Sequence, residues 1–159
     1  MDQYELVKEN ILKYPDELEY FSNVSSELVA KFEKELNIEL KGSYKKFLLD
    51  FGYLSFGALE IFGIPHKKLL KQNEDYTNAL AYTIESRNEI NLSENLIVIY
   101  NFGNGELYCL DLSTDIPKVV SIWDERPEGD QNPPITEVIA ESFEDFLKEY
   151  VNVEIKDFM

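Results

Sequence analysis

Hydrophobic residues in the second half of the chain follow a pattern typical of β-strands. The run LIVIY, residues 96–100, is apolar and largely β-branched, as a buried strand requires. ELYCLDL (106–112) and KVVSIWDE (118–125) follow as two further strands. Asn104 and Gly105 occupy the centre of the first connection and favour a two-residue type I′ turn, in which both central residues need positive φ. Such short connections predict a three-stranded antiparallel meander, because parallel pairing needs a much longer crossover.

Helical spacing of hydrophobic residues predicts helices before and after this meander. Ser25 and Ser142 are placed to cap the N-termini of two of them, and Gly52 is placed to end a third. A weaker stripe, interrupted by the polar residues Thr83 and Arg87, predicts one helix more. The predicted helices cover residues 4–13, 25–36, 43–51, about 75–89 and 142–150.

Two further segments bear on the sheet. Residues 58–64 read as a strand that Pro65 ends, and residues 136–140 form either another strand or an extended lead-in to the last helix. Between the meander and residues 136–140, residues 126–134 form a polar loop rich in proline and glycine. The order of elements predicts a single α+β domain, with an antiparallel sheet of about four to six strands and helices packed on one face.

The meander resembles part of a known family. GNGELYCLD, residues 103–111, followed by a strand that ends near a tryptophan, resembles the Gly-x-Gly-(Asp/Glu)-x-Tyr-x-Leu-Asp segment of the SUKH superfamily, the Smi/Knr-like proteins. Residues 27–52 resemble the opening helix pair of that family, although Lys41 stands where proline is usual. SFEDFL, residues 142–147, resembles its closing helix, so the resemblance covers residues 25–151.

This resemblance implies a function in binding. Many bacterial SUKH proteins look like immunity proteins, which neutralise polymorphic or contact-dependent toxins, often nucleases, whereas fungal relatives look like regulatory scaffolds. The resemblance therefore implies one SUKH-like domain over residues 1–159, without enzymatic activity, whose partner is a cognate toxin. Two alternatives stay open: a regulatory scaffold of the same fold, and an enzyme whose motif is not recognisable.

Composition is consistent with a cytoplasmic protein. The chain has 159 residues, about the length of one domain, and no run approaches the roughly 20 apolar residues of a membrane span. Its acidic, polar N-terminus is unlike a signal peptide. The single cysteine, Cys109, cannot form an internal disulfide, which favours a reducing compartment.

The residues that carry most enzyme chemistry are scarce. His66 is the only histidine, and its place in the chain does not suggest a nucleophile near it. Zinc normally recruits several cysteine or histidine ligands, and this chain has two such residues in total. Gly103 and Gly105 lack the third glycine and the following helix of a dinucleotide site. We therefore expect no catalytic residue, no metal and no cofactor.

Charge is strongly negative and unevenly distributed. The formal net charge is −16, of which residues 1–80 carry −4 and residues 81–159 carry −12. Such a charge repels nucleic acids and anionic membranes and attracts basic proteins. The alternative is that acidity only keeps the protein in solution. We expect a basic protein partner, and a homodimer remains an open possibility.

One acidic segment follows the third predicted strand. Asp124, Glu125, Glu128 and Asp130 place four carboxylates within seven residues, directly after Trp123. An aromatic anchor beside a charged rim is typical of a protein-binding surface. The alternative, which we favour for the tryptophan, is that Trp123 packs into the core; the acids then belong to a solvated loop.

Three further residues are candidates for partner contact. Asp111 ends the second strand of the meander and either contacts a partner or, as we favour, caps a turn with Ser113 and Thr114. Tyr53 and Phe56 begin and end a predicted loop between a helix and the next strand. Their rings either face a partner or close the core.

Overall fold

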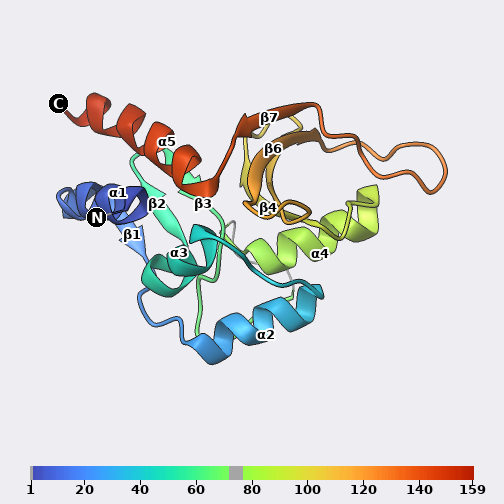
Figure 1. Cartoon of the computed structure of the whole chain (residues 1–159), viewed down its shortest axis with the longest axis horizontal. Helices are drawn as coiled ribbons and strands as arrows, with labels where there is room; N and C mark the ends of the chain where they lie inside the picture. Colours follow the sequence, from blue (N-terminus) through green and yellow to red (C-terminus); the bar gives the residue numbers. More distant parts are fainter. Residues whose placement is uncertain (1, 72–76) are drawn as a thin grey trace.

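Strands from the two halves of the chain form two separate antiparallel sheets (Figure 1). The computed structural model describes residues 2–71 and 77–159. Its α-helices are α1 (Gln3–Leu12), α2 (Ser26–Leu36), α3 (Ser43–Phe51), α4 (Ala79–Ile90) and α5 (Phe143–Phe158). The first sheet contains β1 (Leu18–Tyr20), β2 (Leu54–Phe56) and β3 (Leu59–Ile61) in that order. The second contains β4 (Leu96–Asn101), β5 (Glu106–Asp111), β6 (Lys118–Trp123) and β7 (Glu137–Ala140) in that order.

The helices pack around these sheets. Helix α4 lies below the curved four-stranded sheet and contacts β4, while α5 contacts β3, β6 and β7 (Figure 1). Helix α1 lies along α5, and α2 packs on α3 and α4. Both faces of β5 are buried, so the sheet is covered from two sides instead of on one face only. No helix within the described residues is both long and apolar enough to cross a bilayer.

The helix ends follow local capping chemistry. The Ser25 hydroxyl accepts a hydrogen bond from the Leu28 N–H, and the Ser142 hydroxyl accepts one from the Asp145 N–H, each at 3.1 Å. Both predicted N-caps are therefore confirmed. Helix α4 begins later than predicted because the Asn78 side chain caps it by accepting a hydrogen bond from Ala81 at 3.1 Å. The predicted start of this helix, at residues 75 and 76, lies outside the described residues.

The prediction of a loop over residues 53–56 is wrong. Leu54–Phe56 is strand β2, which forms a hairpin with β3 and also pairs with β1. The predicted strand at residues 58–64 is correspondingly shorter, and β1 was not predicted. Each of these strands is only three residues long, too short for alternation of polar and apolar residues to reveal it.

The α+β class and the antiparallel meander are confirmed, and residues 137–140 do form a strand of the sheet, β7. The strands nevertheless divide into two sheets instead of one. A β-bulge between Val98 and Tyr100 interrupts the regular pairing of β4 with β5. At this bulge the Phe62 N–H donates to the Ile99 carbonyl at 2.8 Å, which joins the two sheets. The Val98 N–H donates to the Thr83 hydroxyl of α4 at 3.1 Å.

The turn between β4 and β5 is not the predicted type I′ turn. Positive φ occurs at Gly103 and Gly105 but not at Asn104, and the strands pair up to a hydrogen bond from Phe102 N–H to the Glu106 carbonyl. A local hydrogen bond explains the difference, because the Asn104 side chain accepts from the Glu106 N–H at 3.0 Å. The connection is therefore a three-residue loop.

Candidate functional site

Trp123 is exposed at the end of β6, which corrects the interpretation that it packs into the core. Its side chain is 44% accessible. The strand partner of Trp123 is Glu106, and the neighbouring Gly105 has no side chain to fill the space beneath the indole. A Cβ built on Gly105 lies 3.6 Å from the Trp123 ring. The indole therefore lies across the hairpin turn, where a partner can reach it.

The acidic segment after Trp123 is an anchored loop. The Arg126 guanidinium donates to the Glu89 carbonyl at 3.3 Å, at the C-terminal end of α4. The Asn91 side chain donates to the Asp130 carbonyl at 2.9 Å, and the Asn132 side chain donates to the Asn91 carbonyl at 2.8 Å. These bonds hold the backbone of the loop, whose acidic side chains are all exposed: Asp124, Glu125, Glu128 and Asp130.

A small hollow lies beside the indole. Its volume is about 200 Å³, and prolines of the loop form much of its wall. The residues that line it are Trp123, Glu125, Arg126, Pro127, Pro133, Pro134 and Thr136. The hollow is large enough for one side chain of a partner, with an aromatic wall on one side and a carboxylate at its rim.

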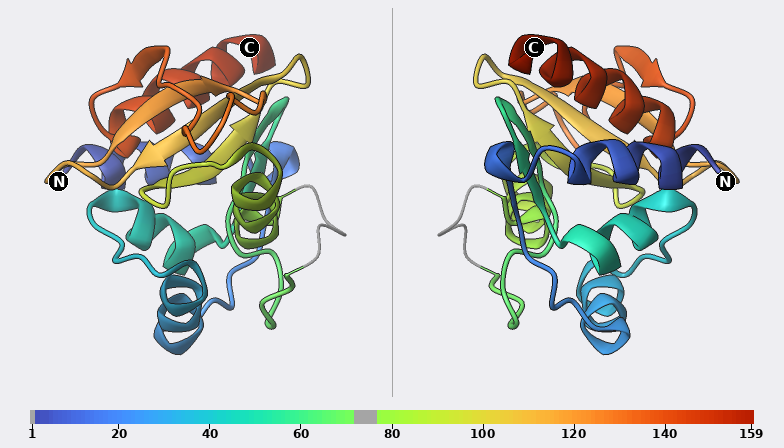
Figure 2. Two further views of the ribbon diagram at one scale, coloured as in Figure 1. Left: turned by 90° about the vertical axis from the view of Figure 1, so that its right-hand side faces the viewer. Right: turned by 90° about the vertical axis from the view of Figure 1, so that its left-hand side faces the viewer.

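A cluster of aromatic rings lies on the same face of the sheet. It joins β4, the turn that follows, β5 and α5, with ring centroids 4.5 to 6.4 Å apart. We call these residues the aromatic cluster: Tyr100, Phe102, Tyr108, Phe146 and Tyr150. Phe146 is fully buried beneath the others, whereas Phe102 is 42% accessible. In Figure 2 the β4–β5 hairpin and α5 both lie in the upper part of the molecule.

Strand register connects the aromatic cluster to Trp123. Trp123 pairs with Glu106, Ser121 pairs with Tyr108, and Ser121 also pairs with Glu137 of β7. Since directly paired residues share a face and side chains alternate along a strand, all five side chains lie on one face of the sheet. The Ser121 hydroxyl donates to the Glu106 carboxylate at 2.6 Å and so holds this acid in place.

Carboxylates border the cluster on two sides. Burial raises the pKa of the Tyr108 phenol, and the charges of Glu106 and Glu137 raise it further. Burial also raises the pKa of Tyr100, with smaller effects from Tyr150 and from two more carboxylates, Glu154 and Glu60.

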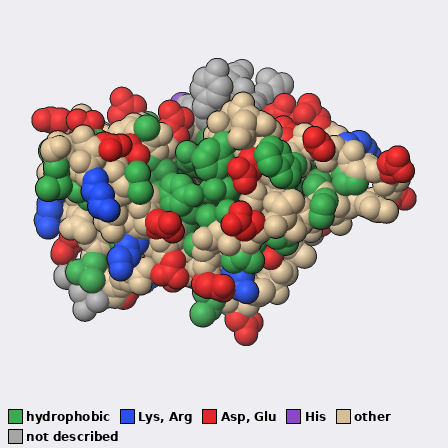
Figure 3. All heavy atoms as spheres, turned by 90° about the horizontal axis from the view of Figure 1, so that it is seen from above, with side chains coloured by type: hydrophobic (Ala, Val, Ile, Leu, Met, Phe, Trp, Pro, Cys, Tyr) green, Lys and Arg blue, Asp and Glu red, His purple; other side chains and the backbone are tan. Residues whose placement is uncertain are grey.

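The space-filling view is taken from above Figure 1, from the side on which α5 and β7 lie. Hydrophobic side chains gather in its middle with carboxylates around them (Figure 3). We name the surface the acidic-aromatic face and define it by Tyr100, Phe102, Glu106, Tyr108, Trp123, Glu137 and Tyr150.

The remaining predicted residues do not join this surface. Asp111 is buried and accepts hydrogen bonds from the Ser113 N–H at 3.0 Å and the Ser113 hydroxyl at 2.7 Å, so it caps a turn as we favoured. Thr114 donates instead to the Ile116 carbonyl. Phe56 is fully buried in β2 and closes the core, while Tyr53 is half-buried.

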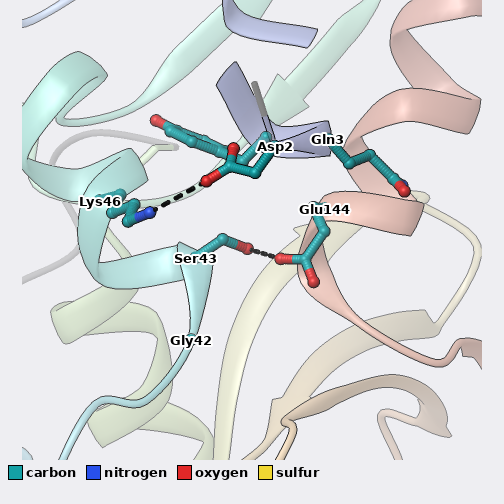
Figure 4. A pocket seen from close by; sticks show the side chains of 7 residues that line it. Asp2, Gln3, Gly42, Ser43, Lys46 and Glu144 are labelled. Carbon is teal, nitrogen blue, oxygen red and sulfur yellow. Dashed lines mark hydrogen bonds and ion pairs between the residues drawn. The ribbon is translucent and has the colours of Figure 1, made fainter. Parts of the chain in front are cut away.

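Another hollow, of about 360 Å³, lies between the N-terminal parts of α1, α3 and α5 (Figure 4). The Ser43 hydroxyl donates to the Glu144 carboxylate, and the Lys46 ammonium lies 3.4 Å from the Asp2 carboxylate. These contacts tie three helices together. Over the described parts of the chain, no three or more His, Cys, Asp or Glu side chains are grouped to hold a metal ion.

Comparison with known proteins identifies relatives by family and by fold. A family model described as SUKH_5, SMI1-KNR4 cell-wall, matches residues 4–152. A solved structure described as a protein from Pseudomonas syringae pv. tomato aligns with a TM-score of 0.57 at 19% sequence identity. The alignment covers 79% of this chain and 87% of that one, and it shows similarity of fold alone. No curated protein matches this chain.

Proposed function

Because the chain belongs to the SUKH family, we propose that it is a bacterial immunity protein that binds and neutralises a cognate basic toxin without catalysing a reaction. The observation that carries the proposal is the exposed Trp123 beside the anchored acidic loop. Interfaces concentrate binding energy in aromatic anchors with a polar rim, and this arrangement supplies both.

Electrostatics explains why an acidic protein suits this role. A toxin that cleaves nucleic acid must expose a basic groove for phosphates. An acidic surface that is rigid before binding can occupy such a groove and exclude the substrate. Opposite charges also accelerate encounter, which matters when a toxin must be captured before it acts. The net charge of −16, concentrated in residues 81–159, supports this mode of binding.

The experiment is neutralisation of the toxin encoded beside the gene for this chain. Co-expression should restore growth, and the purified proteins should form a stoichiometric, inactive complex. A variant with the four loop carboxylates neutralised should bind about tenfold less tightly or worse, since each exposed ion pair contributes up to roughly 1 kcal/mol. Its substitutions are Asp124→Asn, Glu125→Gln, Glu128→Gln and Asp130→Asn.

A matched control removes four exposed carboxylates elsewhere, so that the net charge changes equally. Its substitutions are Glu9→Gln, Asp16→Asn, Glu19→Gln and Glu39→Gln. The control should retain nearly full affinity. Equal loss in both variants would show that only total charge matters, and unchanged protection by the loop variant would place the binding surface elsewhere.

A regulatory scaffold of the same fold is the second candidate. The description of the matched family model as SMI1-KNR4 cell-wall favours it. Gene context separates the two: a toxin gene with a variable C-terminal domain immediately upstream supports the immunity protein. A locus without any such gene supports the scaffold.

A further inference from the structure

We propose that the acidic-aromatic face binds an extended, arginine-bearing segment of the protein partner. This inference rests on the proposed function and assigns part of the contact to a surface distinct from the acidic loop. The face runs from Glu137 of β7 to Trp123 at the end of β6, then across Glu106 of β5 to Phe102 at the hairpin turn. It therefore offers rings and carboxylates in alternation along the width of the sheet.

This alternation of aromatic rings and carboxylates favours arginine as the side chain that the partner presents. A guanidinium is planar, stacks on aromatic rings and pairs with a carboxylate through two parallel hydrogen bonds. Trp123 and Phe102 supply accessible rings, Glu106 of β5 supplies the carboxylate between them, and Glu137 of β7 supplies a second carboxylate on the other side of Trp123. A lysine ammonium has the charge but not the planar shape, and a phosphate is repelled by the same acids.

The surface is organised before a ligand arrives. The Ser121 hydroxyl, which is fully buried, fixes the Glu106 carboxylate at 2.6 Å. The Tyr150 hydroxyl donates to the Tyr108 hydroxyl at 3.2 Å and ties α5 to β5. Fully buried Phe146 packs against Tyr100 and Tyr108, and these two rings in turn contact the exposed ring of Phe102. Binding therefore orders few side chains of this protein, which lowers its entropic cost.

Short peptides test the inference without the toxin. The probes are fluorescein-labelled peptides of three alternating Gly-Arg or Gly-Lys units, which carry the same charge, at low ionic strength. We expect the arginine peptide to bind about threefold tighter or more, because guanidinium stacking adds to the attraction that both peptides share. Trp123, the only tryptophan, provides a second readout, since its emission should change with the arginine peptide.

Two variants locate the contact. Phe102→Ala removes an exposed ring, and the double variant Glu106→Gln/Glu137→Gln removes two carboxylates. Both should abolish the preference for arginine. Matched controls are Ile116→Ala, an exposed side chain at 64% accessibility, and the double variant Glu9→Gln/Glu39→Gln, and both should keep it. Thermal unfolding confirms that each variant is folded.

The outcomes separate this inference from the proposed function. Equal binding of both peptides to the unmodified protein, or equal loss in variants and controls, overturns the inference. Neutralisation of the cognate toxin that survives Glu137→Gln and Phe102→Ala together also overturns it, while the immunity function stands. Failure of the unmodified protein to neutralise the toxin overturns the immunity function, whatever the peptides show.

Discussion

The backbones of Gly52 and Gly63 are in close contact. Gly52 directly follows α3, and Gly63 lies two residues after the end of β3. The Ile64 N–H donates to the Gly52 carbonyl at 2.7 Å, and Gly52 has a φ of 70°. A Cβ on Gly63 would lie 1.8 Å from the Gly52 carbonyl oxygen, so a side chain there is incompatible with this contact. The close approach holds the C-terminal end of α3 against the chain that leaves the first sheet.

Substitution of Gly52 should strongly reduce the stability of the fold. In Gly52→Ala the added Cβ would lie 2.6 Å from the carbonyl oxygens of Phe21 and Ile64, in addition to the strain of positive φ. We expect the free energy of unfolding in urea to fall by more than about 2 kcal/mol. Gly103→Ala is the control, because it has positive φ but open space around it, and should cost about 1 kcal/mol. Similar losses in both variants would contradict the role of close packing.

At the scale of elements, the bulge in β4 determines how the sheets and α4 meet. Because pairing shifts between Val98 and Tyr100, the Ile99 carbonyl is free to accept a hydrogen bond from the N–H of Phe62, the residue directly after β3. The Val98 N–H is then satisfied by the Thr83 hydroxyl, which is fully buried in α4. Thr83, a polar residue that interrupts the hydrophobic stripe of this helix, is therefore the residue that supplies the hydrogen-bond acceptor needed at the bulge.

Replacement of Thr83 by its isostere valine tests whether stability depends on the hydrogen bond between the Thr83 hydroxyl and the Val98 N–H. Thr83→Val leaves the buried Val98 N–H without its acceptor, which we expect to cost about 1 to 3 kcal/mol in the free energy of unfolding. Amide hydrogen exchange at Val98 should also become faster. Thr114→Val, whose hydroxyl bonds to the Ile116 carbonyl near the surface, is the control and should change stability little. Unchanged protection of Val98 would contradict this account.

At the scale of the whole molecule, charge and burial act on different properties. The excess of carboxylates in residues 81–159 creates a negative field that acts on charged molecules as they approach. Buried ionisable groups govern stability instead. Burial raises the pKa of the phenols of Tyr4, Tyr44 and Tyr108 and of the Cys109 thiol, so the folded state retains protons that the unfolded chain loses.

Stability should therefore decline in alkali. Below pH 9 these groups are protonated in both states and their contribution is fully present. As pH rises past the ordinary values of 9.0 for cysteine and 10.0 for tyrosine, only the unfolded chain releases protons, and stability is lost. Urea unfolding between pH 8 and pH 11 should show the decline, and it should be less steep in Tyr44→Phe. Simultaneous ionisation of all ten tyrosines of the native protein near pH 10, seen by ultraviolet absorbance, would contradict it.

Salt should slow binding of the partner. Raising ionic strength shortens the Debye length to about 10 Å at 0.1 M and about 3 Å at 1 M, which screens the field of a protein with net charge −16. We expect the association rate constant, measured by stopped-flow with Trp123 emission, to fall about tenfold or more. The dissociation rate should change much less. An association rate independent of salt would exclude electrostatic steering.

Much of the architecture could be predicted because its signals are local. The caps at Ser25 and Ser142 act through bonds to residues three positions away, and the meander follows from short connections. The candidate site was predictable in part. The acids after Trp123 were visible as a segment, but Tyr100, Phe102 and Tyr150 were missed because they come from separate elements. Their only signal was the placement of Tyr100 and Tyr108 on either side of a hairpin turn, which makes them cross-strand partners.

The sequence by itself determined the α+β class, the antiparallel meander and the acidic balance, since these depend on residue type, spacing and number. Only the tertiary structure decided which way Trp123 faces, how the strands divide at the bulge, and which rings meet on the acidic-aromatic face. Burial depends on what packs against a residue, and residues distant in the chain supply that packing. The sequence around a tryptophan therefore does not show whether the residue is exposed or buried. For Trp123 the answer came from the fold, which places Gly105 beneath the indole.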